Sequence, residues 1–301
     1  MNKLYAITVF FNPAGFHNLL NNYYIFQRQL KQYTNIELMT IELSFNGQFQ
    51  IEGDNVHRLT SNSIMWQKER LINYGISQLP NNAEYFAWMD CDILFLQPNW
   101  LDLLLEKLQI NDIVQTFKKV YFGTKGETEF SPFFKAQQSV IWQYKIHKNW
   151  YNRRTTKDLG FSAPGMSWAG RVDFFKDIGL YDRCITGSGD TFLVDSLLNS
   201  FSLHGYHKYV TSKMTECMSE YTRNLLDKSP RFDYIPIDIL HLYHGTIANR
   251  NYLPRHEILR DNDFDPALDI KLENNVFEWS SDKPDLHNRL KQYFFDRKED
   301  L

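Results

Sequence analysis

The amino-acid sequence predicts an α/β fold, in which a mixed, mostly parallel central sheet is flanked by helices. First, Leu4 to Phe11 is a continuous apolar run ended by Asn12-Pro13, a pattern typical of a strand buried on both faces. Second, residues 16–33 place apolar side chains at helical spacing. Third, strand and helix patterns alternate through residue 122, as they do where right-handed crossovers join parallel strands.

The other elements follow from the same periodicities. Strands are predicted at 36–43, 56–59, 85–89, 112–122 and 234–243, and a strand passing into a helix at 165–175. Helices are predicted at 60–79, with Ser61 or Ser63 as N-cap, and at 99–108, 192–201 and 284–297. Residues 123–165 are expected to form an irregular excursion. No repeat or linker divides the chain, so one domain is expected.

Composition excludes several classes of protein. Aromatic residues make up 16% of the 301 residues and the net charge is −3, which argues against disorder and against a dedicated nucleic-acid binder. The three cysteines form no CxxC pair, so neither a disulfide framework nor a structural zinc site is expected. The start lacks a signal-peptide cleavage pattern, and no long apolar run predicts a membrane span. We therefore expect a cytoplasmic location, or the host cytoplasm for a viral protein.

Asp90 and Asp92 directly follow the predicted strand 85–89. Ligands of open α/β sheets bind outside the carboxyl ends of strands, and alternation along a strand places both carboxylates on one face. There they can share one hard cation such as Mg²⁺ or Mn²⁺. The alternative is a turn with two solvated acids, which the apolar residues on both sides make less natural.

His241 and His244 end the apolar segment 234–243. An imidazole beside carboxylates can complete a metal site and shifts its preference toward Mn²⁺. Arg250 and Arg255 follow, and guanidinium groups match phosphate oxygens bidentately. The alternative is a core histidine bonded to the backbone, with two surface arginines.

The turn Gly187-Ser188-Gly189-Asp190 precedes a predicted helix. Asp is a favoured N-cap and the glycines permit a tight turn. Asp190 is also a candidate general base at the mouth of a site, and the two roles are compatible.

Basic and aromatic residues interleave through 144–157, a stretch that includes Lys145, Trp150, Tyr151 and Arg153. Such a strip can hold a phosphodiester strand through charge and stacking. A solvated loop is the alternative.

Together these segments resemble a GT-A-fold glycosyltransferase that uses a nucleotide sugar. The likeness spans nearly the whole chain and rests on segments in the expected order. Residues 66–73 come first, and residues 86–95 resemble the DxD motif. Residues 165–171 and 187–190 resemble the acceptor side of galactosyltransferase-like members, residues 241–255 resemble their metal-histidine region, and residues 264–266, 278–279 and 297–300 resemble a bacterial and phage branch.

The resemblance implies a Rossmann-like GT-A sheet, a Mn²⁺ (or Mg²⁺) ion and a nucleotide-sugar donor. It divides the single domain, 1–301, into a nucleotide-sugar-binding half at 1–122, an acceptor and metal-completing half at 123–260, and a C-terminal extension at 261–301.

The resemblance also implies roles for single residues. Asp92 and His244 would ligate the metal, with His241 as the competing ligand, and Asp90 would contact the ion, its water or the ribose. Asp190 would take the proton from the acceptor hydroxyl, which favours inversion at the anomeric centre. The other implied contacts are Phe10 and Asn12 to the base, Lys68, Arg250 and Arg255 to the diphosphate, and Trp168 to the acceptor or donor.

Alternatives remain open at this point. A nucleotidyltransferase ranks lower, because residues 12–16 contain one glycine and no basic residue to hold a triphosphate. The acceptor is expected to be a glycan or another hydroxyl compound, with a hydroxymethylated nucleic-acid base as the alternative. A nucleic-acid-binding module without catalysis is the candidate from a different class.

Overall fold

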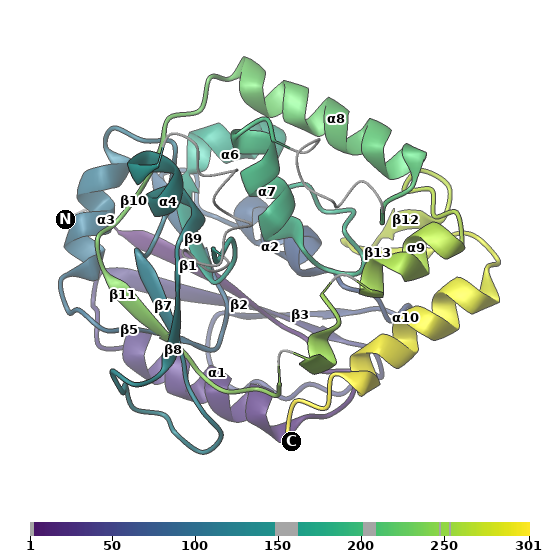
Figure 1. The fold of residues 1–301 in the computed structure, drawn as a ribbon, viewed down its shortest axis with the longest axis horizontal. Helices are drawn as coiled ribbons and strands as arrows, with labels where there is room; N and C mark the ends of the chain where they lie inside the picture. The colour runs from purple at the N-terminus through teal and green to yellow at the C-terminus, as the bar shows by residue number, and fades with distance from the viewer. Residues whose placement is uncertain (1–2, 148–161, 201–208, 247, 253) are drawn as a thin grey trace.

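A seven-stranded sheet forms the centre of the computed structural model, which describes residues 3–147, 162–200, 209–246, 248–252 and 254–301 (Figure 1). Its strands lie in the order β10 (Phe232–Tyr234), β6 (Ile113–Gln115), β9 (Ser167–Arg171), β4 (Tyr85–Met89), β1 (Leu4–Phe10), β2 (Ile36–Ser44) and β3 (Val56–Thr60). Within this sheet β9 alone is antiparallel to its neighbours. The mixed, mostly parallel sheet predicted from the sequence is therefore confirmed.

Helices cover both faces of this sheet (Figure 1). Alternate side chains of β1 point to opposite faces, as the pleat of a strand requires. Ile7 packs in one hydrophobic cluster with α2 (Lys68–Ser77) and α6 (Val172–Ile178). Leu4 packs in another cluster, with α1 (His17–Leu30) and α3 (Trp100–Leu108). The continuous apolar run at the start of the chain thus reflects burial on two sides.

A second, four-stranded sheet continues from the end of β4. Its order is β5 (Ile93–Phe95), β11 (Asp238–His241), β7 (Lys119–Phe122) and β8 (Lys135–Gln138). Residues 90–92 connect β4 of the first sheet to β5 of the second. Because β5 and β11 pair antiparallel, with Ile93 opposite His241, this connection lies beside the end of β11.

Two predicted strands prove to be two strands each. The stretch 112–122 forms β6 and β7, which lie in different sheets, and 234–243 contains the end of β10 and all of β11. The stretch 123–165, expected to be irregular, contains β8 and α4 (Val140–Ile146). Short apolar runs do not show where a chain leaves one sheet for another, which explains the merged strands.

The helix predicted at 60–79 begins only at Lys68, so neither Ser61 nor Ser63 caps it. Both hydroxyls instead bind a hairpin formed by β12 (Ile270–Glu273) and β13 (Val276–Trp279). Ser61 Oγ donates to the Phe277 carbonyl at 3.3 Å, and Ser63 Oγ donates to a Glu278 carboxylate oxygen at 2.5 Å. The two serines that were predicted to cap a helix therefore make long-range hydrogen bonds instead.

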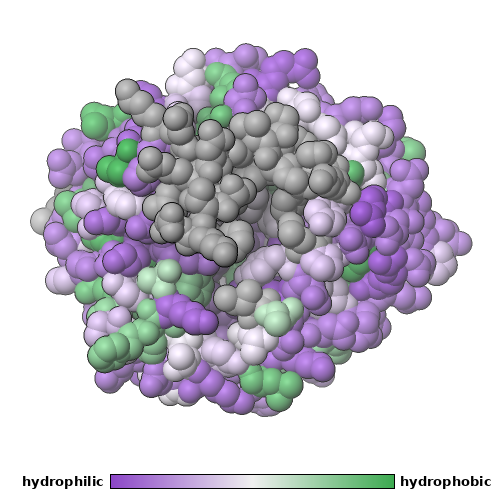
Figure 2. All heavy atoms as spheres, viewed as in Figure 1, coloured by the Kyte–Doolittle hydropathy of each residue, from purple (hydrophilic) through white to green (hydrophobic). Residues whose placement is uncertain are grey.

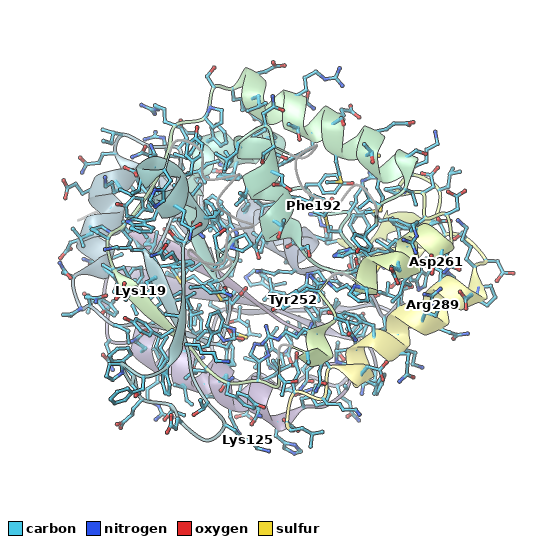
Figure 3. The ribbon with its side chains drawn as sticks, viewed as in Figure 1. Lys119, Lys125, Phe192, Tyr252, Asp261 and Arg289 are labelled. Atoms are coloured by element: carbon cyan, nitrogen blue, oxygen red, sulfur yellow. The ribbon has the colours of Figure 1, made fainter. Side chains whose placement is uncertain are left out.

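The C-terminal part packs beside the main sheet around a third hydrophobic cluster. This part contains α7 (Gly189–Leu197), α8 (Ser212–Asp227), α9 (Glu257–Asp261) and α10 (Pro284–Asp296). Of these helices, α8 was not predicted from the sequence. Asp261 and Arg289 join α9 to α10 through an ion pair of 3.2 Å (Figure 3).

Hydrophilic residues predominate among the coloured residues of the face shown in Figure 2, where the hydrophobic ones form small separate groups. No helix in the part of the chain that the structure describes is both long and apolar enough to cross a membrane.

Trp168 was expected to contact a ligand, and this expectation is wrong. Its side chain is fully buried in the core. The ring stacks on Trp88 with centroids 6.3 Å apart, and Nε1 donates to the Pro164 carbonyl at 2.8 Å. Placed on β9 opposite Trp88 of β4, Trp168 belongs to the packing between the two strands.

We predict that Trp168→Ala lowers the free energy of unfolding by about 3–5 kcal/mol, because it removes a large buried ring. Urea denaturation would measure the loss. Phe133→Ala, at a residue that is 95% exposed, is the control and should change stability by less than about 0.5 kcal/mol. A Trp168→Ala protein as stable as this control would contradict the assignment to the core.

Candidate metal centre

Asp92, His241 and His244 form a buried group beside the end of β11. The backbone N–H of Leu242 donates to the Asp92 carbonyl at 2.7 Å, which brings the two segments together. His244 Nε2 lies 2.8 Å from Asp92 Oδ2, and His241 Nε2 lies 3.6 Å from Asp92 Oδ1. The two histidine Nε2 atoms are 3.2 Å apart. One candidate ligand atom from each residue therefore points to a common place.

The group fits a divalent cation. Asp92 Oδ1 is buried and has no hydrogen-bond partner among the described residues, an arrangement that costs free energy unless another group satisfies it. Two imidazoles and one carboxylate are a donor set suited to Mn²⁺ and other divalent transition metals. Burial lowers the pKa of His241 to about 3, which keeps its imidazole neutral and able to bind a metal.

Burial opposes the charge of Asp92, but His241, His244 and Arg250 outweigh it and hold the pKa of Asp92 below its usual value. The Arg250 guanidinium contacts the His244 ring, with Nη2 3.1 Å from Nδ1, and it also contacts Nε2. Its Nη1 donates to the Tyr252 hydroxyl at 3.0 Å, near the centre of the view in Figure 3. The positive charge of Arg250 thus lies beside the group of Asp92, His241 and His244.

Glu299, near the end of the chain, lies beside the Nδ1 atom of His244. Its Oε1 is 3.4 Å from His244 Nδ1, and Arg297 Nε donates to the same oxygen at 2.5 Å. Burial raises the pKa of Glu299, but Arg297 and His244 outweigh it and bring the pKa down to about 2. Sequence reasoning did not select Glu299 as a site residue. Only the resemblance of 297–300 to related chains marked this segment.

Lys68, Asp90 and Asp190 form a second charged group. The Lys68 ammonium lies 2.5 Å from Asp90 Oδ1 and 3.0 Å from Asp190 Oδ2. Burial opposes the charge of Lys68, but Asp190 and Asp90 raise its pKa well above the ordinary value. Burial also raises the pKa of Asp90 to about 6, against the effect of Lys68.

Asp90 and Asp92 do not lie on one face, so the prediction from strand alternation is wrong. The chain turns after Met89, so residues 90–92 are not extended strand. Asp90 is directed to Lys68, whereas Asp92 is directed to the two histidines. The structure thus places Asp90 outside the group of three candidate ligands.

Glu69, which the sequence analysis did not select, is buried behind the turn that carries Asp190. A Cβ atom added at Gly189 would lie 2.2 Å from its carboxyl group, so any other residue at position 189 would displace the Glu69 side chain. Burial raises the pKa of Glu69 to about 8, with Lys68 opposing and Asp190 adding to the shift. Because Glu69 lies on a helix among buried positions, no sequence pattern distinguished it.

Ser188, and not Asp190, occupies the N-cap position of α7, and Asp190 lies in the first turn of the helix. Ser188 has a φ of 77°, in the left-handed region that non-glycine residues rarely adopt. Its hydroxyl accepts a hydrogen bond from Arg255 Nη2 at 2.5 Å and lies 3.2 Å from His256 Nε2. Arg255 also donates to the Tyr293 hydroxyl at 2.9 Å, so here it supports the turn.

Phe10 and Asn12, predicted to hold a nucleotide base, are directed into the protein. Phe10 is buried and packs edge-on against Tyr23, with centroids 5.8 Å apart. Asn12 Oδ1 accepts from the Phe16 N–H, and its Nδ2 donates to the Phe16 carbonyl, both at 2.9 Å. In this structure, Asn12 therefore stabilises the turn that follows β1.

Most of the basic and aromatic strip at 144–157 lies outside the described residues, which end at 147 and resume at 162. Within the described part, Lys145 lies over the Phe232 ring, 5.4 Å from its centroid.

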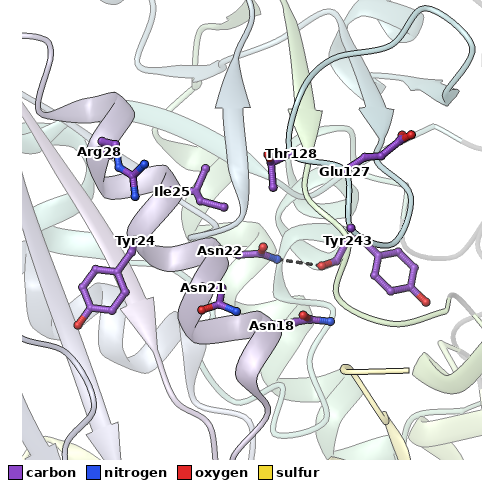
Figure 4. Close-up of a pocket in the computed structure, with 10 residues that line it drawn as sticks. Asn18, Asn21, Asn22, Tyr24, Ile25, Arg28, Glu127, Thr128 and Tyr243 are labelled. Atoms are coloured by element: carbon purple, nitrogen blue, oxygen red, sulfur yellow. Dashed lines mark hydrogen bonds between the residues drawn. The ribbon is translucent and has the colours of Figure 1, made fainter.

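A cavity of about 400 Å³ lies between α1 and the connection from β7 to β8 (Figure 4). Asn18, Asn22, Glu127 and Tyr243 are among the residues that line it. Asn22 Nδ2 donates to the Tyr243 carbonyl at 3.0 Å, so the cavity borders the segment between His241 and His244. The predicted site residues do not line this cavity.

No protein-family model matches the chain, and no curated protein matches it. Similar solved structures include the catalytic domain of Drosophila β1,4-galactosyltransferase 7 in complex with xylobiose (15% identity, TM-score 0.36, 66% of this chain and 62% of that chain). They also include glucosyl-3-phosphoglycerate synthase from Mycobacterium tuberculosis in complex with Mn²⁺, UDP and phosphoglyceric acid (7%, 0.44, 87% and 78%). A third is 4-diphosphocytidyl-2C-methyl-D-erythritol synthase from Anaerococcus prevotii (9%, 0.36, 78% and 87%). The chain thus spans less than two thirds of the Drosophila domain's length.

We predict that Glu69 makes stability depend on pH. Because its pKa is raised to about 8 on folding, the folded protein holds more protons than the unfolded chain between about pH 5 and pH 8. Stability therefore falls as the pH rises through this range. Glu69→Gln removes this contribution, so its melting temperature should fall less over the range than that of the wild type.

Thermal melts in EDTA at a series of pH values would measure the effect. Glu273→Gln, at an exposed residue of β12 paired with Lys271, is the control and should keep the wild-type slope. Equal slopes for the wild type and Glu69→Gln would overturn the prediction.

Proposed function

We propose that the protein is a metal-dependent glycosyltransferase, which moves a sugar from a nucleotide-sugar donor to an acceptor hydroxyl. The observation that carries the proposal is the buried group of Asp92, His241 and His244 at the carboxyl end of β4. Ligand sites of open α/β sheets lie at this edge. A second charged group lies at the same strand end, because Asp90 directly follows β4 and binds Lys68, which also binds Asp190. Two sets of chemical groups are therefore found at one place.

The first set serves the donor. A divalent ion, if held here, would supply positive charge to stabilise the leaving diphosphate. Asp92, His241 and His244 would hold the ion. The Arg250 guanidinium, beside His244, can bind phosphate oxygens bidentately and neutralise further charge.

The second set serves the acceptor. Asp190 would accept the proton of the acceptor hydroxyl, and a base opposite the leaving group inverts the anomeric centre. The Lys68 ammonium binds Asp190 Oδ2 and so holds the carboxylate in one orientation. Lys68 also binds Asp90, so a diphosphate contact by Lys68 remains a prediction.

The proposal leaves the acceptor as a hydroxyl compound. No observation on the described residues favours a nucleic-acid acceptor, because the basic strip lies mostly outside them.

We predict that Asp92→Asn and His244→Gln each abolish stabilisation by Mn²⁺, because each removes one ligand of a three-residue set. A bound ligand at 100 times its dissociation constant adds about 2.7 kcal/mol to stability, which a thermal-shift assay detects readily. Asp173→Asn, at an exposed acid of α6, is the matched control and should respond like the wild type. Wild-type shifts in either ligand variant would refute the metal assignment.

The same assay, run with a panel of sugar nucleotides in the presence of Mn²⁺, would identify the donor. The donor should raise the melting temperature of the wild type beyond the effect of Mn²⁺ alone. A panel without any such shift would count against a nucleotide-sugar enzyme.

We predict that Asp190→Asn keeps the donor-induced shift and lowers the transfer rate by about 10²–10⁴-fold, the usual contribution of a general base. The amide oxygen can still accept from Lys68, so the fold should survive. Release of nucleoside diphosphate from the identified donor would measure the rate. An active variant would exclude Asp190 as the base.

A further inference from the structure

The last residues of the chain pack against the segment that carries His244. In Figure 1 the C-terminus lies beside α1, and Asp300 accepts from the N–H groups of His17 and Asn18 at 3.0 and 2.8 Å. Gly245, with a φ of 91°, lies so close that an added Cβ would be 3.0 Å from Glu299 Cα. The backbone at 299 is thus held directly against the residue after His244.

Glu299 brings a fully buried carboxylate to His244. Its side chain is 1% exposed, and Oε1 lies 3.4 Å from His244 Nδ1. Arg297 binds the same oxygen through Nε at 2.5 Å. Burying a carboxylate is costly unless it is paired, so this one is held by its guanidinium partner with one oxygen toward the imidazole.

The chemistry of His244 makes Glu299 more than a buried ion pair. For Nε2 to bind a metal, the ring hydrogen must be on Nδ1 and needs an acceptor. Two groups face Nδ1, namely Arg250 Nη2 at 3.1 Å and Glu299 Oε1 at 3.4 Å. A guanidinium can only donate, so of these two only the Glu299 carboxylate can accept.

We propose that Glu299 is a positioning residue for the metal centre: it accepts the Nδ1 hydrogen of His244 and so holds the tautomer whose Nε2 lone pair is directed toward Asp92 and His241. Metal-binding histidines commonly donate their second ring N–H to a carboxylate, which fixes the ring and increases its basicity. This inference rests on the metal centre proposed above, and it gives the C-terminal segment a part in that site.

Isothermal titration of the metal-stripped full chain with Mn²⁺ tests the proposal. Glu299→Met fills the same space without an acceptor and should weaken Mn²⁺ binding by about 10- to 100-fold, the range typical for such outer partners. Asp300→Ala is the matched control, because it removes the contact of the same segment with the N–H groups of His17 and Asn18 and leaves Glu299 and its partner Arg297 in place. It should stay within about threefold of the wild type. Equal losses in the two variants would mean that only packing of the segment matters, and would overturn the proposal.

Two further outcomes separate this inference from the proposed function. If the wild type does not bind Mn²⁺, the metal centre itself is wrong. If the wild type binds and Glu299→Met binds equally well, the metal centre stands and the role of Glu299 fails. Should Glu299→Met not fold, Glu299→Gln decides by the same titration, with an expected loss smaller than about 10- to 100-fold but larger than that of Asp300→Ala.

The tautomer provides a readout that a purely structural role would not change. In ¹⁵N spectra of the metal-free protein, with His244 assigned through His244→Gln, the wild type should carry a larger share of the ring hydrogen on Nδ1 than Glu299→Met does, because only the wild type has a carboxylate facing Nδ1. Glu299→Met should move population to the Nε2-protonated form, since Asp92 Oδ2 lies 2.8 Å from that nitrogen and can accept. An unchanged tautomer in Glu299→Met would contradict the proposal.

Discussion

The antiparallel pairing of β5 with β11 is the constraint on which the candidate site depends. It places His241 opposite Ile93, and one further hydrogen bond joins the Leu242 N–H to the Asp92 carbonyl. These two segments are far apart in the sequence. Without their pairing, the turn at 90–92 would not lie beside the two histidines at the end of β11. The segment that follows β11 also carries His244, which lies beside Glu299 near the end of the chain.

Buried charges at this place are consistently paired. Lys68 lies between the carboxylates of Asp90 and Asp190, and Arg297 binds Glu299. Such pairs repay their desolvation only with good geometry, and hydrophobic replacements are often equally stable. A functional role that requires charged side chains therefore explains their grouping at this place better than a contribution to stability does. Perturbed titratable groups gathered in this way are typical of functional sites.

Local patterns predicted the elements best where burial alone determines them. The strands β1, β2 and β4 and the helix α3 lie close to their predicted bounds, because apolar periodicity reports directly on a buried face. Predictions failed where distant segments competed for a residue. The hydroxyls of Ser61 and Ser63 bind the hairpin β12–β13, and the Trp168 side chain is buried in the core.

The sequence by itself determined the α/β class and marked Asp92, His241, His244 and Asp190 as candidates, because residue type and position after an apolar strand are local properties. Only the tertiary structure decided which of them meet. It separated Asp90 from Asp92 by a turn, and it brought Glu299 to His244 across the molecule. Such encounters depend on strand pairing and chain reversal between remote segments, and no local pattern along the chain encodes them.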